Sequence, residues 1–273
     1  MSKTIPFDGA RVLVTGGGSG LGRLLACGAA QRGAAEVIVW DISEERAAAT
    51  VAIIQKHGCA ASSMMVDVTD EAGVVAAGEA VGGIDILINN AGVVSGRPLL
   101  DNSPSSIERT LQVNLHSLFW VTRAFLGGMI DRNWGCVVTV SSAAGLVGPA
   151  RMTDYSASKF GAFGFNEALR NELRQQGSHV HTLIVAPYYM STGMFDGVKT
   201  RFPILLPILR PTKVAVSTLD AIESGRSVLQ LPWFVNSLAL LRLLPVKVLD
   251  VVADFFGINH GMDDFHGRAG DRV

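Results

Sequence analysis

Short apolar runs alternate with amphipathic segments over residues 11–185. The apolar runs predict buried strands at 11–15, 36–41, 63–68, 85–89, 136–141 and 179–185. The amphipathic segments predict helices at 19–32, 44–57, 70–81, 105–130 and 155–175. Continuous apolar strands separated by helices indicate an α/β protein with a doubly wound parallel sheet of the Rossmann type. Such sheets bind ligands at the carboxyl ends of their strands.

No change of composition divides the chain, so we expect one domain over residues 1–273. Residues 188–212 combine large apolar side chains with prolines and Gly197, which predicts an irregular lid over the substrate. The alternative is that they only pack against the body or another subunit. Residues 233–273 form a C-terminal extension whose apolar part carries too many charges to span a bilayer. We prefer a lid or interface helix there to an amphipathic helix lying on a membrane.

The charge balance is almost neutral, with Lys+Arg 23 against Asp+Glu 24. Without a basic cluster the chain is not expected to bind nucleic acid. The N-terminus lacks the apolar run of a signal peptide, so we expect a cytoplasmic protein. Cys27 and Cys136 fall in a predicted helix and strand and are expected to be reduced core residues. His260 and His266 lie in an acidic tail, where we expect solvated side chains rather than a metal site.

A glycine-rich segment, Thr-Gly-Gly-Gly-Ser-Gly-Leu-Gly at 15–22, joins the first predicted strand to the first helix. Glycines permit positive φ and let the backbone approach a pyrophosphate at a helix N-terminus. Gly22 is also expected to bring the helix close to the sheet. The alternative is a plain glycine-rich turn. The cofactor contacts predicted in this segment are Gly16, Ser19, Gly20, Leu21 and Gly22.

Asp41 ends the second predicted strand, where a carboxylate would accept hydrogen bonds from the adenosine ribose. It would repel a 2′-phosphate, and no basic residue follows at once in the run Ile-Ser-Glu-Glu at 42–45. We therefore predict NAD rather than NADP; the alternative is a solvated Asp that caps a turn. Asp67, near the end of the third strand, could bind the adenine or cap the next helix. Ile42 and Val68 are predicted as neighbouring cofactor contacts.

Tyr155 and Lys159 are four residues apart and would share one helix face. A free tyrosine has a pKa of ~10, which is too high for efficient acid/base chemistry near neutrality. A neighbouring ammonium favours the phenolate and would lower that pKa. Ser142, at the end of the fifth strand, could hold a substrate oxygen against Tyr155. An ordinary surface pair is the alternative, but the glycine segment favours hydride transfer between nicotinamide and an alcohol or carbonyl.

These motifs resemble the short-chain dehydrogenase/reductase family over residues 8–230. The matching pieces are the glycine segment, Asn-Asn-Ala-Gly at 89–92, Asn114, Ser142 and Tyr-x-x-x-Lys at 155–159. The resemblance implies that Tyr155 is the acid/base and that Ser142 polarises the substrate oxygen. It also implies that Lys159 binds the nicotinamide ribose and lowers the tyrosine pKa, and that Asn114 supports a water-linked proton relay through Lys159.

The resemblance further implies cofactor contacts on both sides of the site. They are Asn90, Ala91 and Gly92 beside the adenosine, and Pro187, Tyr188, Met190 and Thr192 beside the nicotinamide. Tyr188 stands where the family commonly has glycine, so its ring is expected to narrow the substrate cleft. The runs at 187–195 and 255–264 are similar to the branch that contains retinol dehydrogenases and certain 17β-hydroxysteroid dehydrogenases. The family also implies a homo-oligomer, a dimer or tetramer formed through the helices near 105–130 and 155–175.

The predicted function is an NAD(H)-dependent oxidoreductase that interconverts an alcohol and its ketone or aldehyde. The apolar lid favours a bulky lipophilic substrate of aryl, long-chain, retinoid-like or steroid-like type. One alternative is a catalytically silent NAD(H)-binding sensor or scaffold, which would not need Ser142, Tyr155, Lys159 and Asn114 together. The other is an epimerase or dehydratase of nucleotide sugars. We disfavour it because the C-terminal third is apolar and a separate sugar-binding domain is not evident.

Overall fold

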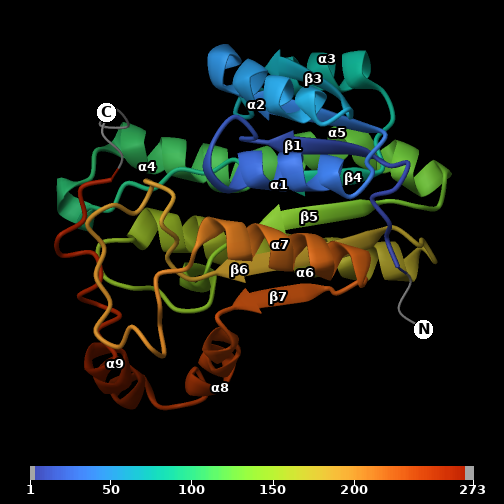
Figure 1. The fold of residues 1–273 in the computed structure, drawn as a ribbon. Coiled ribbons are helices and arrows are strands. Elements are labelled where there is room, and N and C mark those ends of the chain that lie inside the picture. The colour runs from blue at the N-terminus through green and yellow to red at the C-terminus, as the bar shows by residue number, and fades with distance from the viewer. Residues whose placement is uncertain (1–3, 268–273) are drawn as a thin grey trace.

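Seven strands form one parallel sheet within residues 4–267, the part of the chain that the computed structural model describes (Figure 1). The strand order is β3-β2-β1-β4-β5-β6-β7. The strands are β1 (Arg11–Thr15), β2 (Glu36–Asp41), β3 (Ala60–Met65), β4 (Ile86–Asn89), β5 (Cys136–Val140), β6 (His181–Pro187) and β7 (Val228–Leu231). The order reverses between β1 and β4, so the carboxyl ends of these two strands flank the crevice where such sheets bind ligands.

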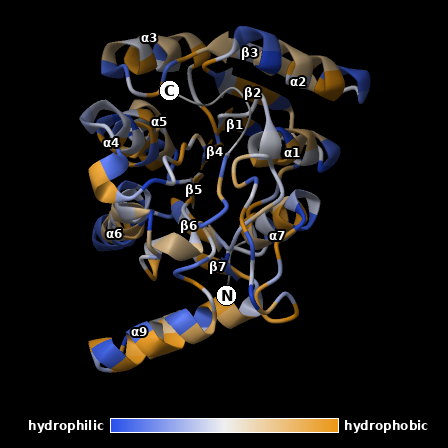
Figure 2. Ribbon diagram, turned by 90° about the vertical axis from the view of Figure 1, so that its left-hand side faces the viewer, coloured by the Kyte–Doolittle hydropathy of each residue, from blue (hydrophilic) through white to orange (hydrophobic). Residues whose placement is uncertain are grey.

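Helices cover both faces of the sheet, as Figure 2 shows. One layer contains α1 (Gly20–Gln31), α2 (Glu44–Lys56) and α7 (Pro211–Glu223). The other contains α3 (Glu71–Val81), α4 (Pro104–Leu111), α5 (Ser117–Asp131) and α6 (Thr153–Gln175). Neighbouring strand residues alternate between the two cores: Val12 and Val14 face the first layer, and Leu13 faces the second. The expected doubly wound Rossmann-type fold is confirmed.

The helix expected over 105–130 is interrupted. A π-helical turn, Gln112–His116, separates α4 from α5, and Asn114 in that turn is buried. A π turn inserts one extra residue into the helix, and the hydrophobic pattern of the sequence does not reveal it. Such turns are frequent at functional sites. The interruption determines where the Asn114 side chain points.

Two strands are displaced from their expected positions, and one strand and one helix were not expected. β3 begins three residues early, because its pairing with β2 sets Ala60 opposite Glu36. β6 runs two residues further than expected, to Pro187, which pairs with Leu231 of β7. β7 is a short strand at the sheet edge with mostly half-exposed side chains, so its pattern is weak. α7, which begins at Pro211, was also missed.

The C-terminal extension leaves the sheet after β7 and forms α8 (Leu238–Leu241) and α9 (Val246–Phe255) (Figure 1). The chain then returns through residues 256–267 to the carboxyl ends of the strands. The last part of the expected extension, residues 268–273, lies outside the described residues. Within the described part, no helix is long and apolar enough to cross a membrane.

Candidate active site

The glycine segment turns tightly over the carboxyl end of β1. Gly16 and Gly20 have φ angles of 63° and 52°, which side chains rarely adopt. A Cβ on Gly22 would collide with the Gly16 carbonyl oxygen, so the first turn of α1 packs tightly on the glycine segment. Ser19 precedes α1 in an extended conformation, and its hydroxyl makes no capping bond to the helix among the described residues. The first-turn amides of α1 therefore remain available to an anion, which fits a dinucleotide pyrophosphate.

Thr15 and Asn90 fasten the glycine segment to the end of β4. The Thr15 hydroxyl accepts hydrogen bonds from the backbone N–H groups of Asn90 (3.0 Å) and Ala91 (3.1 Å). In return, the Asn90 side-chain amide donates to the carbonyl oxygens of Thr15 (3.0 Å) and Gly16 (3.3 Å). Asn90 and Ala91 thus hold the loop in shape. Sequence reasoning did not assign a role to Thr15, although it opens the quoted motif.

Asp41 is a buried carboxylate at the end of β2. Its Oδ2 accepts the Gly18 N–H at 2.9 Å, and its Oδ1 accepts the Ser43 N–H at 3.0 Å. These bonds orient the carboxylate beside the glycine segment, where sequence reasoning expected the adenosine ribose. The structure also places a positive charge here that the sequence did not indicate. A guanidinium nitrogen of Arg46 lies 3.8 Å from Asp41 Oδ1. In the sequence Arg46 follows directly after Glu44 and Glu45, in the first turn of α2.

The adenine-side residues are less uniform. Asp67 lies two residues beyond β3, and its Oδ1 accepts from the Thr69 N–H at 2.9 Å and the Thr69 hydroxyl at 2.7 Å. It therefore forms a local turn and does not cap α3, so that alternative is wrong. Val68 is buried, whereas the Ile42 side chain is exposed. Contacts of Ile42, Asp67 and Val68 with an adenine stay predictions.

The three residues expected to carry the chemistry lie together. Ser142 follows β5, and Tyr155 and Lys159 lie in the first two turns of α6, with all three side chains buried. The Ser142 hydroxyl is hydrogen-bonded to Tyr155. The Lys159 ammonium lies 5.6 Å from the centroid of the Tyr155 ring, on the face expected from the four-residue spacing. It donates to the Val140 carbonyl oxygen at 3.0 Å.

Burial controls the acid/base properties of this group. It raises the pKa of Tyr155 to about 12, against a smaller lowering by the Ser142 hydrogen bond. It also lowers the pKa of Lys159 to about 8, because a buried ammonium loses its hydration. The pKa of Tyr155 is therefore raised, not lowered as expected from the neighbouring Lys159, and desolvation is the largest cause. Tyr155 is protonated at neutral pH.

Asn114 reaches the same site from the π turn. Its Oδ1 accepts the Val93 N–H at 2.8 Å, and its Nδ2 donates to the Val93 carbonyl (2.9 Å) and to Ser158 Oγ (3.1 Å). Ser158, which sequence reasoning missed, donates in turn to the Tyr155 carbonyl at 2.6 Å. A Cβ on Gly92 would lie 3.3 Å from Asn114 Oδ1 and 3.7 Å from Lys159 Nζ. Glycine at 92 thus keeps the space between Asn114 and Lys159 free of a side chain, while the water relay stays a prediction.

The segment after β6 adopts an irregular path. The Pro187 carbonyl lies 3.5 Å from Ser142 Oγ, and the Tyr188 N–H donates to the Leu231 carbonyl of β7 at 2.8 Å. Met190 pairs with Leu209 in an isolated bridge, which closes residues 190–209 into a loop. A Cβ on Gly20 would lie 3.7 Å from Thr192 Cβ, so this loop touches the glycine segment.

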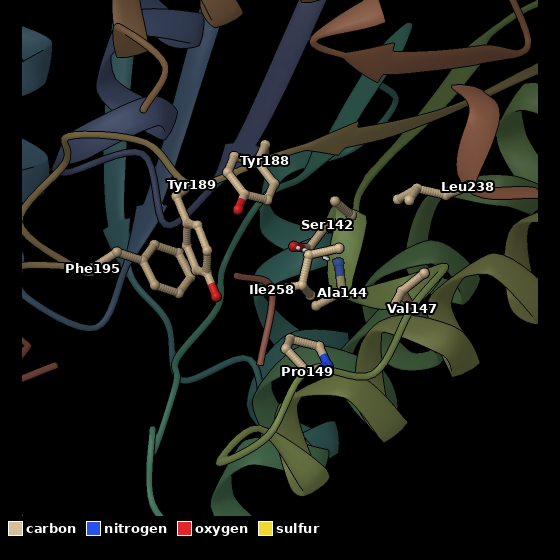
Figure 3. Close-up of a pocket in the computed structure, with 10 residues that line it drawn as sticks. Ser142, Ala144, Val147, Pro149, Tyr188, Tyr189, Phe195, Leu238 and Ile258 are labelled. Carbon is tan, nitrogen blue, oxygen red and sulfur yellow. Dashed lines mark hydrogen bonds between the residues drawn. The ribbon is translucent and has the colours of Figure 1, made fainter. Parts of the chain in front are cut away.

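A partly open pocket lies beside Ser142 (Figure 3). Most of its wall is apolar or aromatic: Ala143, Ala144, Val147, Pro149, Tyr188, Tyr189, Phe195, Leu238 and Ile258. The Tyr188 and Tyr189 rings meet edge to face at 4.7 Å, and Tyr188 lines the pocket as expected. Val147, Pro149 and Tyr189 were not foreseen, since apolar residues in loops carry no distinctive signal. Ser142 thus faces an apolar compartment.

The C-terminal tail packs against this compartment through Met262 and Phe265, whereas His260 and His266 are exposed as expected. Met262 is buried in one cluster with Tyr155 and Tyr189. Ion pairs join Asp264 to Lys199 (2.7 Å) and Asp263 to Arg151 (3.2 Å). The apolar side chains and these pairs hold the tail over the loop 190–209. Among the described residues, no group of three or more His, Cys, Asp or Glu side chains could hold a metal ion.

Residues 10–201 match the family model described as short chain dehydrogenase. The chain is similar to short-chain dehydrogenase/reductase family 16C member 6 of Bos taurus, with 40% identity over 94% of this chain and 83% of that protein. It is also similar to epidermal retinol dehydrogenase 2 of Mus musculus, with 38% identity over 94% of this chain and 85% of that protein. The expected resemblance to the retinol dehydrogenase branch is confirmed.

Two solved structures share the fold. A short-chain dehydrogenase/reductase from Burkholderia phymatum in complex with NAD has a TM-score of 0.79 and 26% identity, over 89% of this chain and 96% of that one. A metagenomic short-chain oxidoreductase in complex with NADP has a TM-score of 0.68 and 28% identity, over 82% of this chain and 96% of that one. The first of these structures holds NAD and the second holds NADP.

Proposed function

The chain belongs to the short-chain dehydrogenase family, and we propose that it is an NAD(H)-dependent oxidoreductase that interconverts a bulky lipophilic alcohol and its ketone or aldehyde. The observation that carries this proposal is the position of the Ser142–Tyr155–Lys159 group. It lies between Gly92, which follows the Asn90 contact to the glycine segment, and an apolar pocket that Ser142 lines. A substrate oxygen placed at Ser142 would project the rest of the molecule into that pocket.

The residues divide the proton chemistry among them. A dinucleotide bound along the glycine segment and Asp41 would supply the hydride donor or acceptor. Ser142 donates a hydrogen bond to the substrate oxygen and holds it beside the Tyr155 hydroxyl. In the direction of reduction, Tyr155 gives its proton to the carbonyl oxygen as that oxygen becomes an alcohol. Its high pKa keeps that proton in place at neutral pH.

Lys159 stabilises the tyrosine after the proton has left. Its ammonium, 5.6 Å from the ring centroid, offsets the negative charge that develops on the phenolate. Burial strengthens this attraction, because few water molecules screen it. Burial also brings the lysine pKa to about 8, so the charged form prevails below that pH.

The lining of the pocket supports a lipophilic substrate. Tyr188, Tyr189 and Phe195 form an aromatic wall, and Val147, Leu238 and Ile258 complete it. A nucleotide sugar would bury several hydroxyl groups against these side chains without partners, at about 1–3 kcal/mol each. A molecule with one reacting oxygen and a hydrocarbon body avoids that cost. The relatives named retinol dehydrogenases make a retinoid-like alcohol the first substrate to test.

The test is cofactor reduction by purified protein with a panel of alcohols, with NAD and NADP run side by side. The panel contains short secondary alcohols, aryl carbinols, long-chain alcohols, retinol and hydroxysteroids. We expect the bulky members to be oxidised with NAD, at kcat/KM values above those of the short alcohols. Turnover of short alcohols alone would contradict the lipophilic substrate, and turnover with NADP alone would contradict the role of Asp41. Cofactor binding without turnover of any member would favour a sensor.

Val147→Phe sharpens this test, because Val147 lines the pocket and the larger ring would occupy space there. We expect kcat/KM for a bulky alcohol to fall about tenfold or more, with little change for a short one. Val147→Ile is the matched control, since it adds a single methylene. Equal losses for both alcohols would show that the pocket does not hold the substrate.

A further inference from the structure

Arg46 and Asp41 form an ion pair at the edge of the proposed ribose site. An Arg46 nitrogen lies 3.8 Å from Asp41 Oδ1. A Cβ built on Gly18 would lie 2.8 Å from Arg46 Cβ, so the arginine stem passes directly over the glycine segment. Its backbone N–H donates to Ser43 Oγ at 3.3 Å, which caps α2 and fixes where the side chain leaves the helix.

The Arg46 guanidinium group keeps a hydrogen-bond donor that no described protein atom accepts. Arg46 Nε is buried and has no hydrogen-bond partner among the described residues. The second arginine beside the loop, Arg23, is different, since it donates to Thr50 Oγ1 and to the Gly18 carbonyl oxygen. Arg46 therefore has the freer donors of the two. A buried donor without a partner is costly and is best explained by a ligand that accepts from it.

Positive as well as negative charges surround the proposed ribose site. Asp41 contributes one negative charge. Arg46, which pairs with Asp41, and Arg23, which donates to the Gly18 carbonyl oxygen, contribute two positive charges. Glu44 and Glu45 add two negative charges in the first turn of α2, where both are exposed. At the Asp41 carboxylate itself, the nearest charged partner is therefore the Arg46 guanidinium.

We propose that Arg46 is the residue that sets the choice between NADH and NADPH. It offsets the repulsion between Asp41 and a 2′-phosphate and offers that phosphate a planar pair of donors. The protein then binds NADPH within about tenfold of NADH, although Asp41 favours the free ribose hydroxyl. This inference rests on the proposed function, since it assumes that the dinucleotide lies along the glycine segment.

The test measures binding and does not need a substrate. The dissociation constants of NADH and NADPH are obtained from the change in their own fluorescence on titration with wild type, Arg46→Gln, Arg46→Lys and Lys56→Gln. Arg46→Gln keeps the backbone bond to Ser43. Lys56→Gln removes the same charge from an exposed position in the last turn of the same helix. Arg46→Lys keeps the charge and loses the planar fork.

We expect Arg46→Gln to weaken NADPH about tenfold or more and to change NADH less than about threefold. Arg46→Lys should recover part of the loss, and Lys56→Gln should leave both constants as in wild type. If both dinucleotides bind and Arg46→Gln leaves their ratio unchanged, the inference is overturned and the proposed function stands. If wild type binds neither dinucleotide, the proposed function and the inference are both overturned.

Discussion

Gly22 lies so close to Gly16 that a single methyl group on residue 22 would collide with the Gly16 carbonyl oxygen. This contact joins the first turn of α1 to the loop that precedes it. The same Cβ would lie 2.5 Å from the Asn90 side-chain amide, which fastens the loop to β4. The glycine segment can therefore keep this shape only if residue 22 has no Cβ atom.

Gly22→Ala is predicted to destabilise the fold and to impair dinucleotide binding together. Overpacking at this contact should cost about 1–3 kcal/mol in the free energy of unfolding, since the crowding partner is backbone. Urea denaturation and NADH titration measure the two effects. The control is Gly164→Ala in α6, where nothing lies within 4 Å of the added Cβ and the helix gains up to about 1 kcal/mol. A Gly22→Ala protein with wild-type stability and affinity would refute this reading of the loop.

The pH dependence of carbonyl reduction should follow Lys159. Burial brings its pKa to about 8, so the ammonium form, which stabilises the developing phenolate, prevails below that pH. The rate should consequently fall as the pH rises through about 8. The measurement is kcat at saturating cofactor from about pH 6 to 10. A rate that stays level over that range would show that the charge of Lys159 is not required.

Ser158 is predicted to stabilise the site by joining α6 to the π turn. Ser158→Ala removes the acceptor of the Asn114 amide at 3.1 Å and should cost about 1–3 kcal/mol in stability. Ser156 offers a matched control, because its hydroxyl is buried in the same helix without a partner among the described residues. Ser156→Ala should therefore be nearly neutral. Equal losses in the two variants would mean that the Asn114 bond contributes nothing.

Much of this architecture could be read from the sequence because its signals are local. The buried strands β1, β2 and β4 are continuous apolar runs, and Gly22, Asp41, Ser142, Tyr155 and Lys159 lie at strand ends or in the helix turns that follow. What could not be read depends on partners far along the chain. The position of β3 is set by its pairing with β2. The short strand β7 is defined by its pairing with β6 at the edge of the sheet.

The same distinction applies within the site. The position of Asn114 depends on a π turn, which adds a residue without changing the hydrophobic pattern. Arg46 was overlooked because the helix that begins at Glu44 folds its side chain back toward Asp41. Likewise, the value of the Tyr155 pKa depends on burial, and a four-residue spacing to a lysine cannot reveal how much water surrounds the pair.

We propose that the protein forms a homo-oligomer through α5 and α6, where Phe119 is 43% exposed and its ring lies 4.9 Å from that of Phe165. Phe119→Glu should dissociate the oligomer, because a carboxylate cannot be buried there without a partner. Light scattering on a sizing column gives the mass. Phe255→Glu, on the exposed side of α9, should leave the mass unchanged. Dissociation by Phe255→Glu alone would move the interface to the C-terminal extension.

The measurement that tests the central claim most directly is the turnover of Tyr155→Phe and Ser142→Ala with the best bulky alcohol of the panel. NADH affinity and thermal unfolding are recorded on the same preparations. We predict that each variant loses about 10²- to 10⁴-fold in kcat while it still binds NADH and unfolds cooperatively. Turnover near the wild-type value in both variants would contradict the account, because neither hydroxyl would then take part in moving the proton.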